Sequence, residues 1–192
     1  AGLRELNLSR NHIQAFDGLE RCTRLGKVNL SNNYICAVPS ANKMNALASL
    51  TELRLSKNRL TAFPFACLSL PSLRALHLDE NSIAEIEPVL GCPLLETLEL
   101  AFNDIKGLDS VANLSGCQRL KFLNLSENPV AGTSHFAAAA RRLLPSLAEL
   151  NNEPVDAGGE ASCAARLGTS LLKWTCIRKL NPERLKQNSP DQ

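Results

Sequence analysis

Apolar and polar residues follow one another along this chain in a block of eleven residues that recurs six times. The block reads Leu-x-x-Leu-x-Leu-x-x-Asn-x-φ, where φ is Ile, Leu or Val, as in LTELRLSKNRL from Leu50. Two leucines separated by one residue have the period of a strand that buries one face. Each block therefore predicts one short strand, and the asparagine that follows it predicts a turn.

The asparagines recur every 22 to 25 residues, at Asn11, Asn33, Asn58, Asn81, Asn103 and Asn128. This period and block resemble the leucine-rich repeat. One repeat cannot bury its apolar side alone, so stacked repeats share a core and pair their strands. The predicted fold is an α/β, right-handed leucine-rich-repeat solenoid, with a parallel sheet on the concave side and short helices or 3₁₀ turns on the convex side. We expect each Asn amide to bond to backbone groups of its own loop and of the next copy.

The pattern changes after Val130, where we expect a helical cap over residues 131–155 that closes a solenoid spanning residues 1–155. Thr133-Ser134 predicts the start of a helix over about 135–144, and Pro145 predicts its end. The next leucines, Leu147 and Leu150, match the first two of a truncated seventh repeat.

A second helix is predicted over about 160–180, within a C-terminal segment of residues 156–192. Its apolar face would carry Cys163, Leu167, Leu171, Trp174 and Arg178. Such a helix either packs on the cap or binds a partner.

The stretch NPV…F…RRLLPSLAELNNEPV resembles the C-terminal cap of the cytosolic leucine-rich-repeat class. That class includes the small regulatory subunit of protein phosphatase 1, the axonemal dynein light chain and the spliceosomal A-prime protein. Many of these caps have Leu-Asp where this chain has Leu150-Asn151, and either side chain can bond to a nearby backbone N–H. The resemblance, over residues 1–155, implies binding of proteins through the solenoid and identifies no particular partner.

The charges are unevenly distributed, although the net charge is only +2. Residues 1–63 carry nine Lys/Arg and four Asp/Glu, whereas residues 64–130 carry four Lys/Arg and nine Asp/Glu. A nucleic-acid-binding protein usually keeps one basic face. The distribution therefore makes direct nucleic-acid binding an unattractive hypothesis.

The seven cysteines include no Cys-x-x-Cys pair and no set with zinc-ligand spacing. Cys22, Cys92 and Cys117 each lie three residues before the first leucine of a block, a position that Leu47 also occupies. A position shared by Cys and Leu is expected to be buried. Dispersed, buried thiols are typical of a reducing compartment. We therefore expect a cytoplasmic protein, of the cytoskeleton or the cilium in one interpretation, and the nucleus is the alternative location. No apolar run is long enough to predict membrane insertion.

Candidate binding residues occupy the variable positions between the leucines, which stack into columns on the concave side. Phe102 and Phe122 are predicted to face solvent there in adjacent repeats, although Phe102 could instead fold into the core. Exposed aromatic residues flanked by charge are typical of binding hot spots. The predicted protein-binding residues are Arg54, Arg74, His77, Glu99, Phe102 and Phe122.

No nucleophile with a base and no phosphate-binding glycine loop is visible, so no catalysis, cofactor or metal is predicted. The expected function is a non-catalytic protein–protein interaction module, the recognition domain of a larger intracellular scaffold that is cytoskeletal, ciliary or phosphatase-linked. The alternative is a ribonucleoprotein assembly factor that grips an RNA-binding protein. The chain lacks an initiator Met and looks like a piece of a longer protein. We expect this piece itself to be monomeric.

Overall fold

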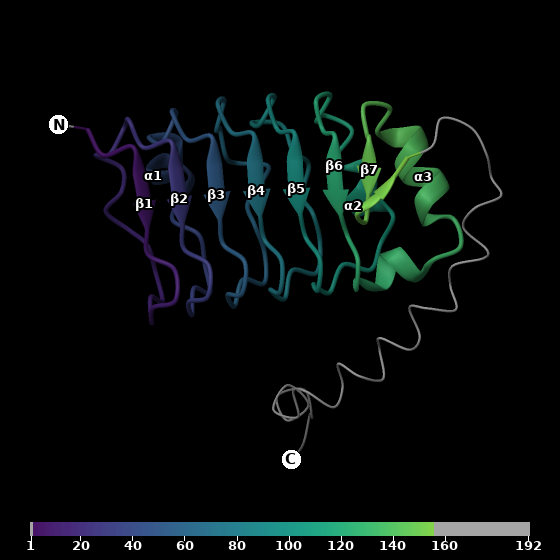
Figure 1. Ribbon diagram of the computed structural model, residues 1–192, viewed down its shortest axis with the longest axis horizontal. Helices are drawn as coiled ribbons and strands as arrows, with labels where there is room; N and C mark the ends of the chain where they lie inside the picture. Colours follow the sequence, from purple (N-terminus) through teal and green to yellow (C-terminus); the bar gives the residue numbers. More distant parts are fainter. Residues whose placement is uncertain (1, 156–192) are drawn as a thin grey trace, which may run out of the picture. The chain divides into compact units, whose positions relative to one another are not determined.

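The computed structural model describes residues 2–155, which form a stack of repeats around one sheet (Figure 1). Seven strands, β1 to β7, are parallel and follow one another in sequence order, and β8 pairs antiparallel with β7. The strands are β1 (Glu5–Asn7), β2 (Lys27–Asn29), β3 (Glu52–Arg54), β4 (Ala75–His77), β5 (Thr97–Glu99), β6 (Phe122–Asn124), β7 (Glu149–Leu150) and β8 (Glu153–Pro154). The parallel leucine-rich-repeat solenoid predicted from the sequence is confirmed.

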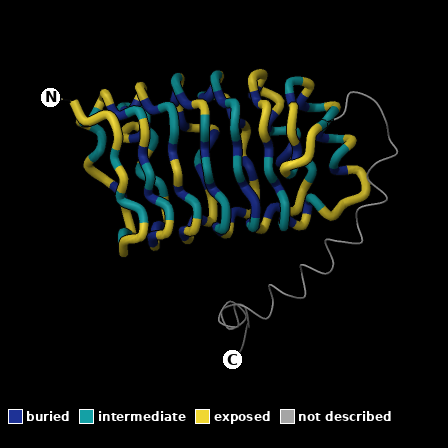
Figure 2. The backbone as a smooth tube through the Cα atoms, in the orientation of Figure 1, coloured by how far each residue is buried: buried dark blue, intermediate teal, exposed yellow. Residues whose placement is uncertain are grey.

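The middle residue of each three-residue strand lies in the core, and its two neighbours lie on the opposite face. Leu53, for example, is buried between Glu52 and Arg54, and it is in register with Leu76 of β4. Figure 2 shows this alternation along the tube. The outward-facing side of the sheet is called the strand face below.

The segments that return from one strand to the next cover the other side of the core. They contain α1 (Ala41–Asn45), α2 (Asp109–Ala112) and the 3₁₀ helix η1 (Pro129–Gly132), and Figure 1 shows α1 and α2 behind the strands. The predicted short helical turns on this side are therefore confirmed. None of the helices within residues 2–155 is long and apolar enough to cross a membrane.

The repeat asparagines connect adjacent repeats through buried hydrogen bonds. The Asn103 amide nitrogen donates to the carbonyls of Leu78 and Leu100 at 3.0 and 2.9 Å, and its Oδ1 accepts the Ile83 N–H at 2.9 Å. Asn33, Asn58, Asn81 and Asn128 make the same set of bonds. Each asparagine thus satisfies backbone groups that would otherwise be buried without a partner.

The direction of these bonds differs from our prediction. The amide reaches back to the preceding copy, as Asn103 does to Leu78 and Ile83, and not forward to the next one. The φ residue of each repeat, such as Ile83, donates its N–H toward the following repeat. The asparagine of that following repeat accepts it, so its amide faces backward. Within the described residues no repeat lies before that of Asn11, and its exposed amide bonds there to Leu8 and Ser9 of its own loop.

Pro129 ends this pattern in the sixth repeat. In earlier repeats the residue after the asparagine donates its N–H to the φ residue of the preceding repeat, as Asp104 does to the Ile83 carbonyl at 2.9 Å. Pro129 has no N–H, so the carbonyl of Ile105 is left for Val130, which donates to it at 2.9 Å. Val130 therefore needs no asparagine from a seventh repeat.

The last part of the stack contains α3 (Phe136–Leu143), close to the predicted range, and Leu147 and Leu150 are buried as expected. The predicted helix cap by Thr133-Ser134 is wrong, because α3 starts after His135 without a side-chain cap and Thr133 Oγ1 donates to the Val130 carbonyl instead.

Asn151 stands where many of the caps that this chain resembles have Asp, and it makes the expected bond to a backbone N–H. Asn151 Oδ1 accepts the N–H of Leu125 at 2.8 Å. In inner repeats the corresponding N–H donates to a strand carbonyl, as Leu100 does to Asn124. The Asn151 side chain thus continues the hydrogen bonding of the sheet where β7 stops.

The shared cysteine position is buried in the inner repeats. Cys92, Cys117 and Leu47 are each 2% exposed, and Cys22, in the first repeat, is half-buried. Burial raises the pKa of Cys92, and it raises the pKa of Cys117 to about 12, so these thiols are poor nucleophiles. The predicted helix over about 160–180 lies outside the described residues.

Replacement of Asn103 by Ala is expected to lower the free energy of unfolding by about 3 kcal/mol, because it leaves the buried Ile83 N–H without a partner and removes one of the two amide bonds at each of the Leu78 and Leu100 carbonyls. Asn11→Ala is the matched control, since Asn11 has the same repeat position but is exposed, and it is expected to change stability by less than about 1 kcal/mol. Urea unfolding of both variants measures the difference, and equal losses would show that the bonds between repeats contribute nothing extra.

Candidate binding face

The strand face carries two rows of side chains that cross all the repeats. The first residue of each strand forms one row, in the order Glu5, Lys27, Glu52, Ala75, Thr97, Phe122 and Glu149. The third residue forms the other row, in the order Asn7, Asn29, Arg54, His77, Glu99 and Asn124. The strand register therefore brings residues more than twenty positions apart in sequence into contact distance.

Three predicted binding residues are neighbours in the second row. Arg54, His77 and Glu99 lie on β3, β4 and β5 and are paired in register. Arg54 is exposed and its Nε donates to Glu52 Oε1. His77 and Glu99 are half-buried. The structure thus joins a cation, an imidazole and a carboxylate in one line across the middle of the sheet.

Phe122 lies beside this line, at the start of β6. Its register neighbours in the first row are Thr97 on β5 and Glu149 on β7, and Ala75 lies one strand beyond Thr97. Phe122 is 37% exposed, which makes it one of the few large apolar side chains on the surface of the described part. Arg54, His77, Glu99 and Phe122 together are called the central patch below.

The predicted site residue Arg74 lies outside the central patch. It precedes β4, at the edge where the strands begin, and its guanidinium donates to Glu96 at 2.6 Å. Glu96 also accepts from Lys121 at 3.2 Å. The bond from Lys121, followed by that from Arg74, lowers the pKa of Glu96. Arg74 therefore belongs to a surface ion-pair network at the edge where the strands begin, and its role in binding stays a prediction.

Phe102 lies beyond the end of β5, whereas Phe122 is the first residue of β6. Phe102 follows β5 in the turn, with a left-handed φ of 55°, and it is half-buried. Its N–H donates to the Ser126 carbonyl at 2.9 Å, which extends the sheet hydrogen bonds into the loop. Phe102 and Phe122 thus lie at opposite ends of the strands and do not form one aromatic surface.

The position of Phe102 has a left-handed backbone in every repeat. The residues are Arg10, Asn32, Lys57, Glu80, Phe102 and Glu127, with φ between 52° and 63°. Asn tolerates this conformation, but a bulky residue such as Phe rarely adopts it. A strained turn shared by all repeats could not be inferred from the variable residue types at this position.

The electrostatic environment differs along the second row. Burial raises the pKa of Glu99, and the nearby carboxylates of Asp79 and Glu149 raise it further, while a hydrogen bond to Asn124 opposes the shift. Burial lowers the pKa of His77, and the positive charge of Arg54 lowers it further. Both shifts disfavour the charged form of the side chain relative to its ordinary value.

A shallow hollow that the sequence did not indicate lies on the strand face of the first three repeats. It has a volume of about 270 Å³ and is lined by Glu5, Leu6, Asn7, Lys27, Val28, Asn29, Glu52 and Arg54. The amide oxygens of Asn7 and Asn29 accept the N–H groups of Ser9 and Ser31, which turns these short side chains toward the loops.

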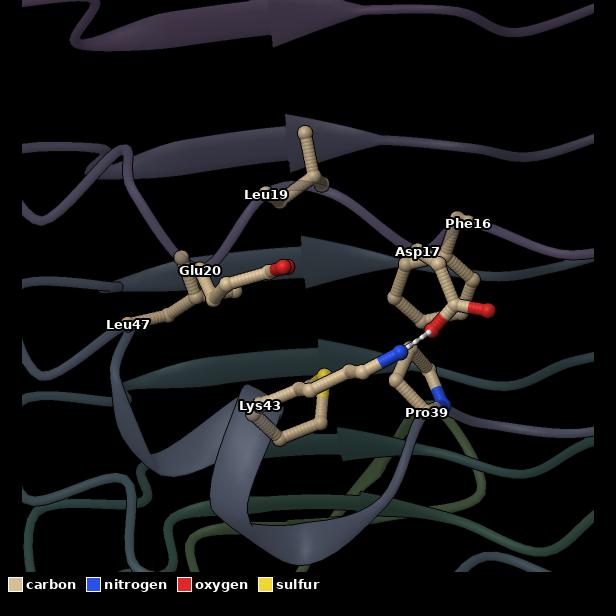
Figure 3. A pocket seen from close by; sticks show the side chains of 8 residues that line it. Phe16, Asp17, Leu19, Glu20, Pro39, Lys43 and Leu47 are labelled. Carbon is tan, nitrogen blue, oxygen red and sulfur yellow. Dashed lines mark hydrogen bonds and ion pairs between the residues drawn. The ribbon is translucent and has the colours of Figure 1, made fainter.

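A second depression lies on the side of the stack opposite the strand face and is too small for a ligand. Figure 3 shows Lys43 and Asp17 joined across it, with the Lys43 amine 2.9 Å from the carboxylate. This bond raises the pKa of Lys43. The remaining space of about 10 Å³ holds at most a single water molecule.

No three His, Cys, Asp or Glu side chains within residues 2–155 are arranged to hold a metal ion. The two predicted site residues that titrate, His77 and Glu99, are neighbours on the strand face, where they are open to a partner surface. The geometry is that of a polar surface with one aromatic side chain, which is typical of protein recognition.

Two family models match the chain. One described as "Leucine rich repeat" matches residues 23–83, and one described as "Leucine Rich repeat" matches residues 3–15 and 91–108. Both models match the stacked strands and turns described above.

Among curated proteins, the chain is 40% identical over 103 residues to the probable serine/threonine-protein kinase pats1 of Dictyostelium discoideum. It is 34% identical over 109 residues to the adenylate cyclase of Schizosaccharomyces pombe. These matches cover 50% and 54% of this chain, and only 3% and 6% of the two relatives. The similarity therefore concerns a small part of each relative.

Among solved structures, the chain is similar to one from the Drosophila melanogaster SNF/U2A′ complex, with a TM-score of 0.55. The match covers 88% of this chain and 87% of that chain at 22% identity. At this identity the similarity shows a common fold.

The geometry of the second row predicts the titration of His77. Its pKa is expected to lie below the ordinary value for histidine, and Arg54→Ala is expected to raise it, because the Arg54 charge disfavours the imidazolium. NMR titration of the imidazole resonances measures both effects. Arg74→Ala removes the same charge at the strand-start edge and serves as the control. Equal shifts in the two variants would contradict the placement of Arg54 beside His77.

Proposed function

We propose that this chain, a leucine-rich-repeat protein, is a non-catalytic module that binds a protein partner through the central patch of its strand face. The observation that carries the proposal is the line of Arg54, His77 and Glu99 beside the exposed ring of Phe122. Leucine-rich repeats typically serve in interactions with proteins or RNA. The strand face is the surface that the sequence predicted to be concave.

The central patch has the composition of an interface core. Phe122 supplies an aromatic anchor whose ring is 37% exposed although its backbone is fixed in β6. Neighbouring Ala75 and Thr97 leave room for a partner side chain against the ring. A fixed aromatic group surrounded by polar side chains loses little entropy on binding and is typical of a hot spot.

The charges of the strand face are balanced on its first three strands and acidic toward the cap. Lys27 pairs with Glu5 at 3.5 Å and Arg54 pairs with Glu52, whereas Glu99 and Glu149 place carboxylates on β5 and β7. A partner that places cationic groups over Glu99 and Glu149 would be favoured.

The wider role that we propose is the recognition domain of a larger intracellular scaffold, in a cytoskeletal, ciliary or phosphatase-linked setting. Its support is the resemblance of the cap to the cytosolic class and the dispersed cysteines, of which Cys92 and Cys117 are buried. The activities of the kinase and the cyclase that the chain resembles belong to proteins of which the match covers only a few per cent.

Phe122→Ala and Glu99→Lys are expected to lower the affinity for the partner at least tenfold, because they remove the anchor and reverse the adjacent charge. Quantitative affinity capture from cells compares the proteins recovered by each variant with those recovered by the unmodified chain. Thermal unfolding shows that each variant is folded.

Leu90→Ala is the matched control for these variants. Leu90 is 75% exposed and lies in a return segment, so its removal deletes a large apolar side chain without touching the strand face. Partners that are lost with Phe122→Ala and kept with Leu90→Ala support the proposal. Equal recovery by all variants would exclude the central patch as the binding site.

A second candidate function is the assembly of a ribonucleoprotein by binding an RNA-binding protein. The observation that favours it is the match to a chain of the SNF/U2A′ complex, which extends over nearly the whole of both chains. The excess of Lys and Arg in residues 1–63 is compatible with a partner that carries RNA.

RNase treatment of the captured complexes separates the two functions. An assembly factor is expected to recover RNA-binding proteins that remain bound after RNase, because it contacts the protein directly. A scaffold module is expected to recover no such proteins before or after treatment. Partners that are released by RNase would contradict direct contact with the protein.

A further inference from the structure

A row of side chains directly after the repeat asparagines lies at the edge toward which the strand arrows point in Figure 1, called the loop edge here. In the first three repeats these residues are His12, Tyr34 and Arg59. The His12 and Tyr34 rings are stacked, with centroids 5.4 Å apart and 19° between their planes. The Arg59 guanidinium carbon lies 4.4 Å from the Tyr34 centroid. These three residues are called the stacked row.

Tyr34 is covered on both faces but is still exposed. Its repeat lies between those of His12 and Arg59 in the order of the sheet, so the two neighbours approach the ring from opposite sides. The side chain nevertheless remains 39% exposed. The exposed part is therefore the ring edge with its hydroxyl group.

The backbone beneath the stacked row is fixed. The N–H of Tyr34 donates to the Ile13 carbonyl at 2.9 Å, and the N–H of Arg59 donates to the Ile35 carbonyl at 2.8 Å. The side chains thus start from anchored positions and restrict one another by stacking. A ligand that binds them has less conformational freedom to remove.

The charge at the loop edge changes sign between the third and fourth repeats. Arg10 and Lys57 lie directly before the repeat asparagines, two positions before His12 and Arg59. In repeats one to three, the residues directly before and directly after the asparagine include no acidic residue. In repeats four to six the same positions carry the acidic residues Glu80, Asp104 and Glu127. Lys57 pairs with Glu80 at 3.2 Å where the two halves meet. Within residues 2–155, Arg10 and Arg59 make no ion pair.

We propose that the stacked row, with Arg10, binds an acidic peptide segment of a protein partner, on a surface distinct from the central patch. A guanidinium that is stacked on an aromatic ring keeps its N–H donors at the rim of its plane, where a carboxylate can accept two of them. The Tyr34 hydroxyl and the His12 ring provide further polar groups along the same line. Charge complementarity therefore selects carboxylates.

The spacing of the repeats specifies the form of the acidic segment. His12 and Arg59 lie two repeats apart, which corresponds to roughly 10 Å at the usual separation of strands. A polyproline II peptide has three residues per turn and rises about 3.1 Å per residue, so side chains three positions apart project on the same side roughly 9 Å apart. An extended peptide with acidic residues three positions apart matches this spacing.

Single-stranded nucleic acid is disfavoured by the same geometry. Proteins that bind it without sequence preference stack bases on open aromatic faces. His12 and Arg59 already occupy the two faces of Tyr34, so a base cannot stack there without displacing one of them. The basic groups remain available to carboxylates along the ring edge.

Binding is measured by fluorescence anisotropy with the 192-residue chain and a labelled peptide, EAPEAPEAP, whose glutamates are three positions apart. The peptide QAPQAPQAP is the uncharged control, and a uridine decanucleotide is the nucleic-acid probe. The glutamate peptide is expected to bind at least tenfold more tightly than the glutamine peptide.

Variants of exposed residues assign the binding to the stacked row. Arg59→Ala and Tyr34→Ala are expected to weaken binding at least fivefold, and Arg59→Lys is expected to restore only part of the loss, because lysine lacks the planar fork. Lys106→Ala removes an exposed cation from the fifth repeat and is expected to change Kd less than twofold. Phe122→Ala is expected to leave peptide binding intact, so failure of the central patch and failure of the stacked row are separate results.

Three outcomes would overturn the proposal. The first is equal binding of the glutamate and glutamine peptides, or of the unmodified chain and Arg59→Ala. The second is tighter binding of the uridine oligonucleotide that depends on Arg59, which would make the ligand a nucleic acid. The third is a concentration-dependent dimer in analytical ultracentrifugation that Arg59→Ala abolishes, which would make the occupant the acidic loop edge of a second copy.

Discussion

The buried asparagine amide is the interaction on which the rest of the structure depends. A solenoid turns its chain sharply after every strand, and the turn would bury backbone N–H and C=O groups without partners. Asn103 supplies two donors and one acceptor to these groups, and equivalent residues do so in the inner repeats. The leucines provide the apolar core, but this amide is what makes each turn compatible with burial and sets one repeat in register on another.

Because leucines and asparagines fix the backbone, the positions between them can vary without loss of the fold, and function is left to them. The variable positions lie on two separate surfaces, the strand face and the loop edge. The central patch combines a half-buried imidazole and carboxylate with an exposed ring. The stacked row combines two rings with the guanidinium group of Arg59, which makes no ion pair within the described residues. A rigid backbone thus presents two chemically different surfaces whose side chains can change independently.

The sequence predicted the features that depend on one repeat alone. Buried leucines, the strand after each first leucine and the shared cysteine position all follow from residue type and spacing, and so does the row that joins Arg54, His77 and Glu99. The sequence did not predict the features that depend on how neighbouring repeats meet. They are the backward direction of the asparagine bonds, the ion pair of Arg74 with Glu96 and the hydrogen bond from the Phe102 N–H to the next repeat. The shallow hollow on the first three strands was not predicted for the same reason.

The proline of the sixth repeat restricts where further repeats can be added to the stack. Pro129 removes the one N–H that would compete for the Ile105 carbonyl, and Val130 is satisfied without help from a later asparagine. A repeat duplicated before Pro129 inherits complete hydrogen bonding on both sides. In a repeat added after Pro129, the asparagine oxygen would have no free N–H to accept, because the Val130 N–H already donates to the Ile105 carbonyl. The number of repeats in such a chain can therefore change by duplication upstream of the proline, while the downstream end stays as it is.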